Sequence, residues 1–147
     1  MLCYKNGALA REQVRDRYAN ADWTTFNNLI EQTPAGCNGF MGFYFPLPEI
    51  IPPGVLGEYF FTTQMIKTTV KPPLAVDSVP ESIHPRAIIE SQFLSIKSRI
   101  EAMLPKDSPH LKRLVISGGS SQNLTIRQLA AVCTFFFLFL FLVYFVL

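Results

Sequence analysis

The sequence predicts an α/β layer arrangement, and three observations in its second half support this fold class. An amphipathic helix is expected from Pro85 to about Leu104, and a short apolar strand is expected at Leu111–Ser117. A glycine turn then leads into another helix that begins at about Leu124. A helix, a strand, a glycine turn and a helix in this order are typical of α/β units.

The first thirty residues predict a strand and two helices. Met1–Tyr4 is an apolar run that suggests a short strand, and Asn6-Gly7 after it is a strong turn signal. Leu9–Tyr18 is rich in helix formers. Asp22 is expected to cap a second helix, which carries Trp23–Ile30.

The next fifty residues favour strands and connections. Pro34–Pro53 combines glycine, proline and aromatic residues, which predicts an edge strand and an ordered loop. Leu56–Val70 has room for two short strands. Lys71–Glu81 is rich in proline and is expected to be an exposed connection.

The helix expected from Pro85 has one apolar stripe, because its large apolar residues recur at spacings of three and four. These residues are Ile89, Phe93, Ile96, Ile100 and Met103. The charged residues fall mainly on other faces: Arg86, Glu90, Lys97 and Glu101. Core packing is the expected role of this helix.

Charge and cysteine content exclude several classes of function. The net charge of +2 comes from scattered basic residues, so no nucleic-acid partner is expected. Cys3, Cys37 and Cys133 are far apart, which favours reduced thiols in an intracellular protein. His84 and His110 lie in proline-containing connections without a paired acid, so they are expected at the surface.

No catalytic residue and no metal ligand can be assigned from spacing. Glu49 and Glu58 have no partner that implies acid–base work. The candidate with chemical content is the glycine pair Gly118-Gly119, because a bare backbone before a helix N-terminus can cradle an anion or a flat ring. A tight connection is the competing interpretation, with Asn123 as a helix cap.

Four stretches, taken together, resemble the C-terminal domain of the eukaryotic xylulose kinases in the FGGY carbohydrate kinase family. They are MLCYKNGALARE, NGFMGFYFPLPEIIPP, PRAIIESQFLSIKSRIEAM and LVISGGSSQN. The resemblance runs from Met1 to about Ala131. It implies a partial, actin-like (ribonuclease H-like) ATPase domain over residues 1–131.

The resemblance also implies an activity and a set of site residues. Such enzymes are cytoplasmic, use ATP and Mg²⁺, and phosphorylate D-xylulose to D-xylulose 5-phosphate in xylose catabolism. Gly118 and Gly119 are then expected to lie against the nucleotide, with Ser120 and Asn123 near the adenosine. The family's general-base aspartate and sugar pocket lie in an N-terminal domain that has no counterpart in this sequence. The segment is therefore expected to be inactive alone.

The apolar tail, residues 132–147, has two interpretations. No charged residue follows Arg127, and residues 129–147 would extend about 28 Å as a helix, close to the thickness of a bilayer core. The tail could thus form a single-pass C-terminal transmembrane helix together with residues 129–131, in a non-enzymatic, tail-anchored membrane module with a vestigial nucleotide-binding turn. The favoured interpretation is translation of a retained intron, since Val132-Cys133 and the Phe/Leu-rich run match translated intron sequence.

Overall fold

The computed structural model describes residues 3–63, 73–105, 107 and 113–136. The chain divides into two compact units, Met1–Ser91 and Gln92–Leu147. The first unit contains two helices, a sheet and the start of a long helix. The second contains the rest of that helix and a shorter one, so the predicted mixture of helices and strands is confirmed in outline.

Helices α1 (Gly7–Tyr18) and α2 (Trp23–Gln32) form where the sequence predicts them. Asp22 is the N-cap of α2, and its carboxylate accepts hydrogen bonds from the backbone N–H and the hydroxyl of Thr25. This cap satisfies one of the helix's unpaired N–H groups. The predicted strand at the N-terminus is wrong for the residues that can be described, because Cys3 and Tyr4 form no strand.

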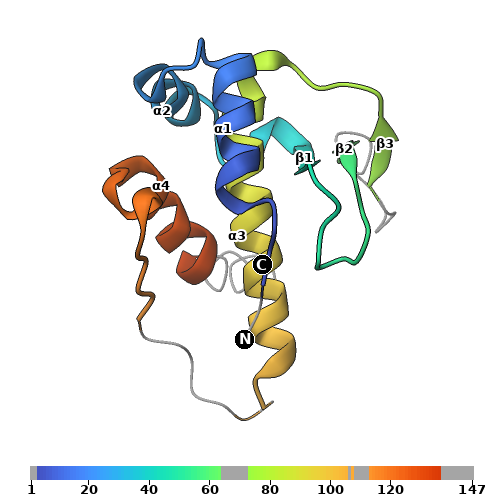
Figure 1. Ribbon diagram of the computed structural model, residues 1–147, viewed down its shortest axis with the longest axis vertical. Coiled ribbons are helices and arrows are strands. Elements are labelled where there is room, and N and C mark those ends of the chain that lie inside the picture. The colour runs from blue at the N-terminus through green and yellow to red at the C-terminus, as the bar shows by residue number, and fades with distance from the viewer. Residues whose placement is uncertain (1–2, 64–72, 106, 108–112, 137–147) are drawn as a thin grey trace, which may run out of the picture. The chain divides into compact units, whose positions relative to one another are not determined.

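The sheet contains β1 (Phe40–Phe45), β2 (Gly57–Thr62) and β3 (Leu74–Val76), side by side in that order (Figure 1). Both pairs are antiparallel. β1 confirms the predicted edge strand. β3 corrects the expected connection over residues 71–81, because three residues beyond a proline suffice for an edge strand. The second strand expected within residues 56–70 falls mostly outside the described residues.

Helix α3 (His84–Met103) is confirmed, but its apolar stripe is buried only near its beginning. Ile88 and Ile89 are fully buried, whereas Met103 is 59% exposed. Phe93, Ile96 and Ile100 are intermediate. The compact first unit ends at Ser91, so only the first two turns of α3 belong to its core. The stripe prediction was therefore wrong for the second half of the helix.

The second unit ends in α4 (Leu124–Ala131), as predicted, and in a π-helical turn over Val132–Phe136. The expected strand at residues 111–117 is not formed within 113–117, and Val115 is 80% exposed there. A strand needs a partner, which β propensity alone does not supply. No helix in the described part of the chain is long and apolar enough to cross a membrane, and residues 137–147 of the tail lie outside that part.

Candidate nucleotide-binding turn

The four predicted site residues come together in one turn before α4. Gly118 has φ +82°, and a 3₁₀ turn follows at Gly119–Gln122. The backbone N–H and the hydroxyl of Ser121 both donate to the carbonyl of Gly118, at 3.0 and 2.7 Å. A positive φ favours glycine at position 118. Position 119 has no such requirement, and a Cβ atom added there would meet none of the described atoms within 4 Å.

Asn123 is the N-cap of α4. Its side-chain oxygen accepts a hydrogen bond from the backbone N–H of Ile126 at 3.1 Å, and its own N–H donates to the carbonyl of Ser120. The capping interpretation of Asn123 is therefore confirmed. Its role near an adenosine stays a prediction, as do the nucleotide contacts of Gly118, Gly119 and Ser120.

The turn offers backbone and amide groups, and these fit a nucleotide better than a metal. Mg²⁺ in proteins is held mainly by carboxylates and phosphate oxygens. The segment GGSSQN contains no carboxylate, and no cluster of three His, Cys, Asp or Glu side chains occurs within the described residues. A Mg²⁺ ion, which the resemblance implies, does not fit this turn.

His84 is buried, which corrects its predicted surface position. It is only 3% exposed as the first residue of α3. Its ring stacks on Tyr18 at 3.7 Å, and its Nδ1 lies 2.8 Å from the hydroxyl of Tyr44. Burial, and to a smaller extent the nearby charge of Arg17, lower the pKa of His84 to about 4. His84 is therefore a neutral structural residue, while His110 lies outside the described residues.

Gly42 in β1 allows Tyr44 to reach His84. A Cβ atom added at Gly42 would come within 2.5 Å of the Tyr44 hydroxyl, so the tyrosine ring occupies the space that a side chain would fill. Burial is also the main reason why the pKa of Tyr44 is raised, so its phenol stays protonated and can donate to His84.

Glu49 is a buried carboxylate that spacing alone did not reveal. Its oxygens accept hydrogen bonds from the backbone N–H groups of Lys5, Asn6 and Ile50, and from the side-chain amide of Asn6. Burial alone would raise the pKa of Glu49, but these hydrogen bonds outweigh it and lower the pKa below its usual value. Each carboxylate oxygen accepts two of these hydrogen bonds, so Glu49 anchors the N-terminal segment.

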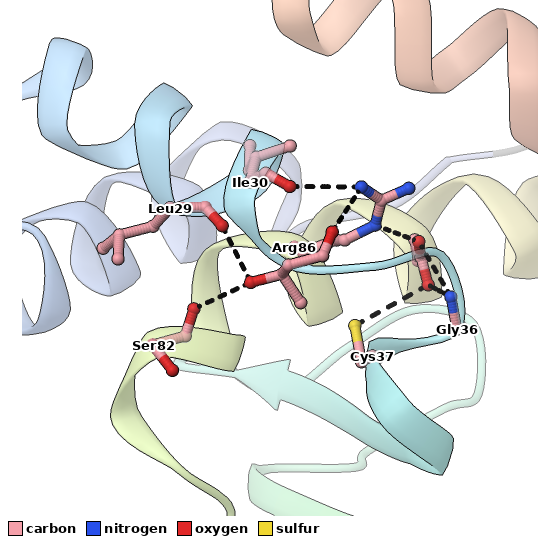
Figure 2. Close-up of polar contacts among 8 residues, drawn as sticks. Leu29, Ile30, Gly36, Cys37, Ser82 and Arg86 are labelled. Atoms are coloured by element: carbon pink, nitrogen blue, oxygen red, sulfur yellow. Dashed lines mark hydrogen bonds and ion pairs between the residues drawn. The ribbon is translucent and has the colours of Figure 1, made fainter.

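A second polar network joins α3 to the end of α2 (Figure 2). Arg86 donates to Glu90 at 2.6 Å, and to the carbonyls of Ile30 and Thr33 at 3.1 and 2.7 Å. Both charged side chains are mostly buried. The sequence placed Arg86 and Glu90 on faces other than the apolar stripe, but it gave no sign that they are enclosed.

One small pocket lies in the first unit, with a volume of about 50 Å³. Its lining includes Gln13, Tyr44 and Glu58. A cavity of this size has room for a few water molecules, because one water needs roughly 10–15 Å³ of this kind of volume. It is too small for a sugar or a nucleotide.

Comparison with known proteins identifies the family. The C-terminal domain of the FGGY family of carbohydrate kinases matches residues 74–134. Xylulose kinase of Mus musculus is 34% identical over 131 residues, which are 89% of this chain and 22% of the relative. Xylulose kinase 2 of Arabidopsis thaliana is 38% identical over 133 residues, with coverages of 88% and 23%.

A fungal relative agrees with these two. Probable D-xylulose kinase A of Arthroderma otae is 35% identical over 157 residues, which cover 88% of this chain and 26% of the relative. The chain spans about a quarter of the length of the curated relatives it matches. It belongs to the FGGY family of carbohydrate kinases, as a segment of the C-terminal domain of the xylulose kinase type.

Proposed function

We propose that this chain forms part of a xylulose kinase, which transfers the γ-phosphate of ATP to D-xylulose and yields D-xylulose 5-phosphate in the cytoplasm. The observation that carries the proposal is the similarity to xylulose kinases of animals, plants and fungi over nearly nine-tenths of the chain. The matched segment includes the glycine turn. The proposal extends to an actin-like (ribonuclease H-like) domain fold and to the use of Mg²⁺ with ATP.

In this proposal the glycine turn contributes to the nucleotide side of the reaction. Gly119 presents backbone without a side chain, so a flat ring can approach it closely. The positive φ of Gly118 and the cap formed by Asn123 hold the turn in shape. Phosphoryl transfer depends on positioning and charge stabilisation, and this segment would supply positioning. We expect no turnover of D-xylulose by this segment alone.

A chimaeric enzyme tests the activity. Residues 1–131 would replace the matching segment of the Mus musculus xylulose kinase, and ADP release would be measured with and without D-xylulose. We expect xylulose-dependent turnover. A chimaera that folds, binds ATP and still releases no ADP with D-xylulose would refute the proposal.

The variant Gly119→Ala tests the nucleotide contact in the same chimaera. Alanine fits this position without meeting a described atom, so its effect reports on the ligand and not on the fold. We expect KM for ATP to rise at least tenfold, while KM for D-xylulose stays within twofold. Gly7→Ala is the matched control, because that position is equally open and begins α1. Equal KM values for ATP in both variants would exclude Gly119 from the nucleotide site.

A further inference from the structure

The connection between α2 and β1 is left-handed over four successive residues. Gly36, Cys37, Asn38 and Gly39 have φ values of +73°, +50°, +56° and +84°. Cys37 and Asn38 carry side chains, which disfavour this conformation. The N–H of Gly39 donates to the carbonyl of Gly36 at 2.8 Å, and the N–H of Phe40 donates to the carbonyl of Cys37. A run of this kind persists only where its surroundings hold it.

The carboxylate of Glu90, in α3, stabilises this turn from outside. Its carboxylate accepts a hydrogen bond from the backbone N–H of Gly36 at 3.1 Å and one from the thiol of Cys37 at 3.7 Å (Figure 2). Arg86 fixes the other carboxylate oxygen at 2.6 Å. The two charged side chains are only 12% and 13% exposed, so water competes weakly for the Arg86–Glu90 ion pair, whereas the hydrogen bond to Gly36 lies at the surface.

The far end of the left-handed turn is tied to the sheet. The carbonyl of Gly39 accepts hydrogen bonds from the backbone N–H and the hydroxyl of Thr63, at 2.7 and 3.0 Å. The next pair, Phe40 with Thr62, is the first in the register of β1 and β2. The handedness of the turn therefore fixes the direction in which β1 enters the sheet.

We propose that Glu90 is the latch of a conformational switch in the turn formed by residues 36–39. While its carboxylate binds the Gly36 N–H, the turn is left-handed and the first pair of β1 and β2 is closed. When the carboxylate is withdrawn, Cys37 and Asn38 relax to negative φ and this end of the sheet opens. This switch is independent of the kinase activity proposed above.

Hydrogen exchange of the whole chain, followed amide by amide by NMR, tests the proposal. Glu90→Gln keeps the side-chain shape but turns one acceptor oxygen into a donor that faces other donors. We expect the Gly39 amide to exchange at least tenfold faster. The Ala10 amide, bonded to the carbonyl of Asn6 in α1, should change less than twofold. Glu101→Gln, which removes the exposed partner of Lys97 on the same helix, should leave both amides within twofold.

A second variant separates release of the turn from general unfolding. Asn38→Gly in the Glu90→Gln background should restore most of the protection at Gly39, because glycine adopts positive φ without a steric penalty. Unchanged exchange at Gly39 in Glu90→Gln would overturn the proposal. Equal acceleration at Gly39 and Ala10, or failure of Asn38→Gly to restore protection, would overturn it too.

Discussion

The buried His84 makes the first unit sensitive to mild acid. In the folded chain its pKa is lowered to about 4, against an ordinary value of 6.5. As the pH falls through 6.5, His84 becomes protonated in the unfolded chain but stays neutral in the folded chain. The free energy of unfolding therefore falls. The loss continues until the pH reaches the folded pKa and is complete below it. A difference of this size corresponds to roughly 3 kcal/mol.

The surroundings of His84 explain why it stays neutral in the folded chain. Burial is the main cause, and the charge of Arg17 adds to it. The phenol of Tyr44, whose own pKa is raised, stays neutral, and its hydroxyl lies 2.8 Å from Nδ1. Protonation would place a charge in an aromatic cluster with Tyr18 and Phe60.

Urea unfolding between pH 7.5 and 4 measures the effect. The single tryptophan, Trp23, lies in the first unit against Phe26 and provides the fluorescence signal. We expect the wild-type free energy of unfolding to fall by up to about 3 kcal/mol over this range. His84→Gln should remove most of the slope between pH 6.5 and 4.5, whereas His110→Gln, at the other histidine, should keep it. An unchanged slope in His84→Gln would refute the reasoning.

Three further predictions follow from single features. Glu49→Gln should lower the free energy of unfolding at pH 7 by about 2–4 kcal/mol, because buried N–H groups lose a charged acceptor, and urea denaturation measures this change. Because the pKa of Glu49 is lowered in the folded chain, the wild type should also lose stability as the pH falls below the ordinary pKa of 4.5. Asn123→Ala should destabilise α4 by about 1 kcal/mol, seen as faster exchange of the Ile126 amide. Sequencing of mature transcripts should find a splice junction after the Ala131 codon, and uninterrupted Phe-rich codons in mature message would contradict the retained-intron interpretation of residues 132–147.

Local signals predicted the helices well. The Asp22 and Asn123 caps lie where the sequence places them, because a cap interacts with residues only three positions away. α3 was predicted for the same reason, since its periodicity is local. The strand expected at residues 111–117 was wrong within the described residues 113–117, because a strand depends on partners elsewhere in the chain. Neither β propensity nor a following glycine turn shows whether a partner is present.

The polar residues of the first unit were missed because their partners are distant in sequence. Tyr44 lies 40 positions from His84, and Asn6 lies 43 positions from Glu49. No spacing rule joins such pairs, so His84 resembled a surface histidine and Glu49 an isolated acid. The glycine pair and the Asn123 cap were found from local sequence, whereas their roles at a nucleotide come from the family resemblance. The structure adds the reason for glycine at position 118, where φ is positive.

The residues in the first turns of α3 affect how the match to the FGGY C-terminal domain is interpreted. His84, Arg86 and Glu90 lie within the segment that matches the FGGY C-terminal domain, and each of them holds the scaffold together. Similarity over this segment can therefore arise from the demands of folding as well as from those of nucleotide binding. An effect on kinase activity can be separated from an effect on folding only with a substitution that leaves the fold unchanged. Gly119→Ala has this property, because the described structure leaves room for its methyl group.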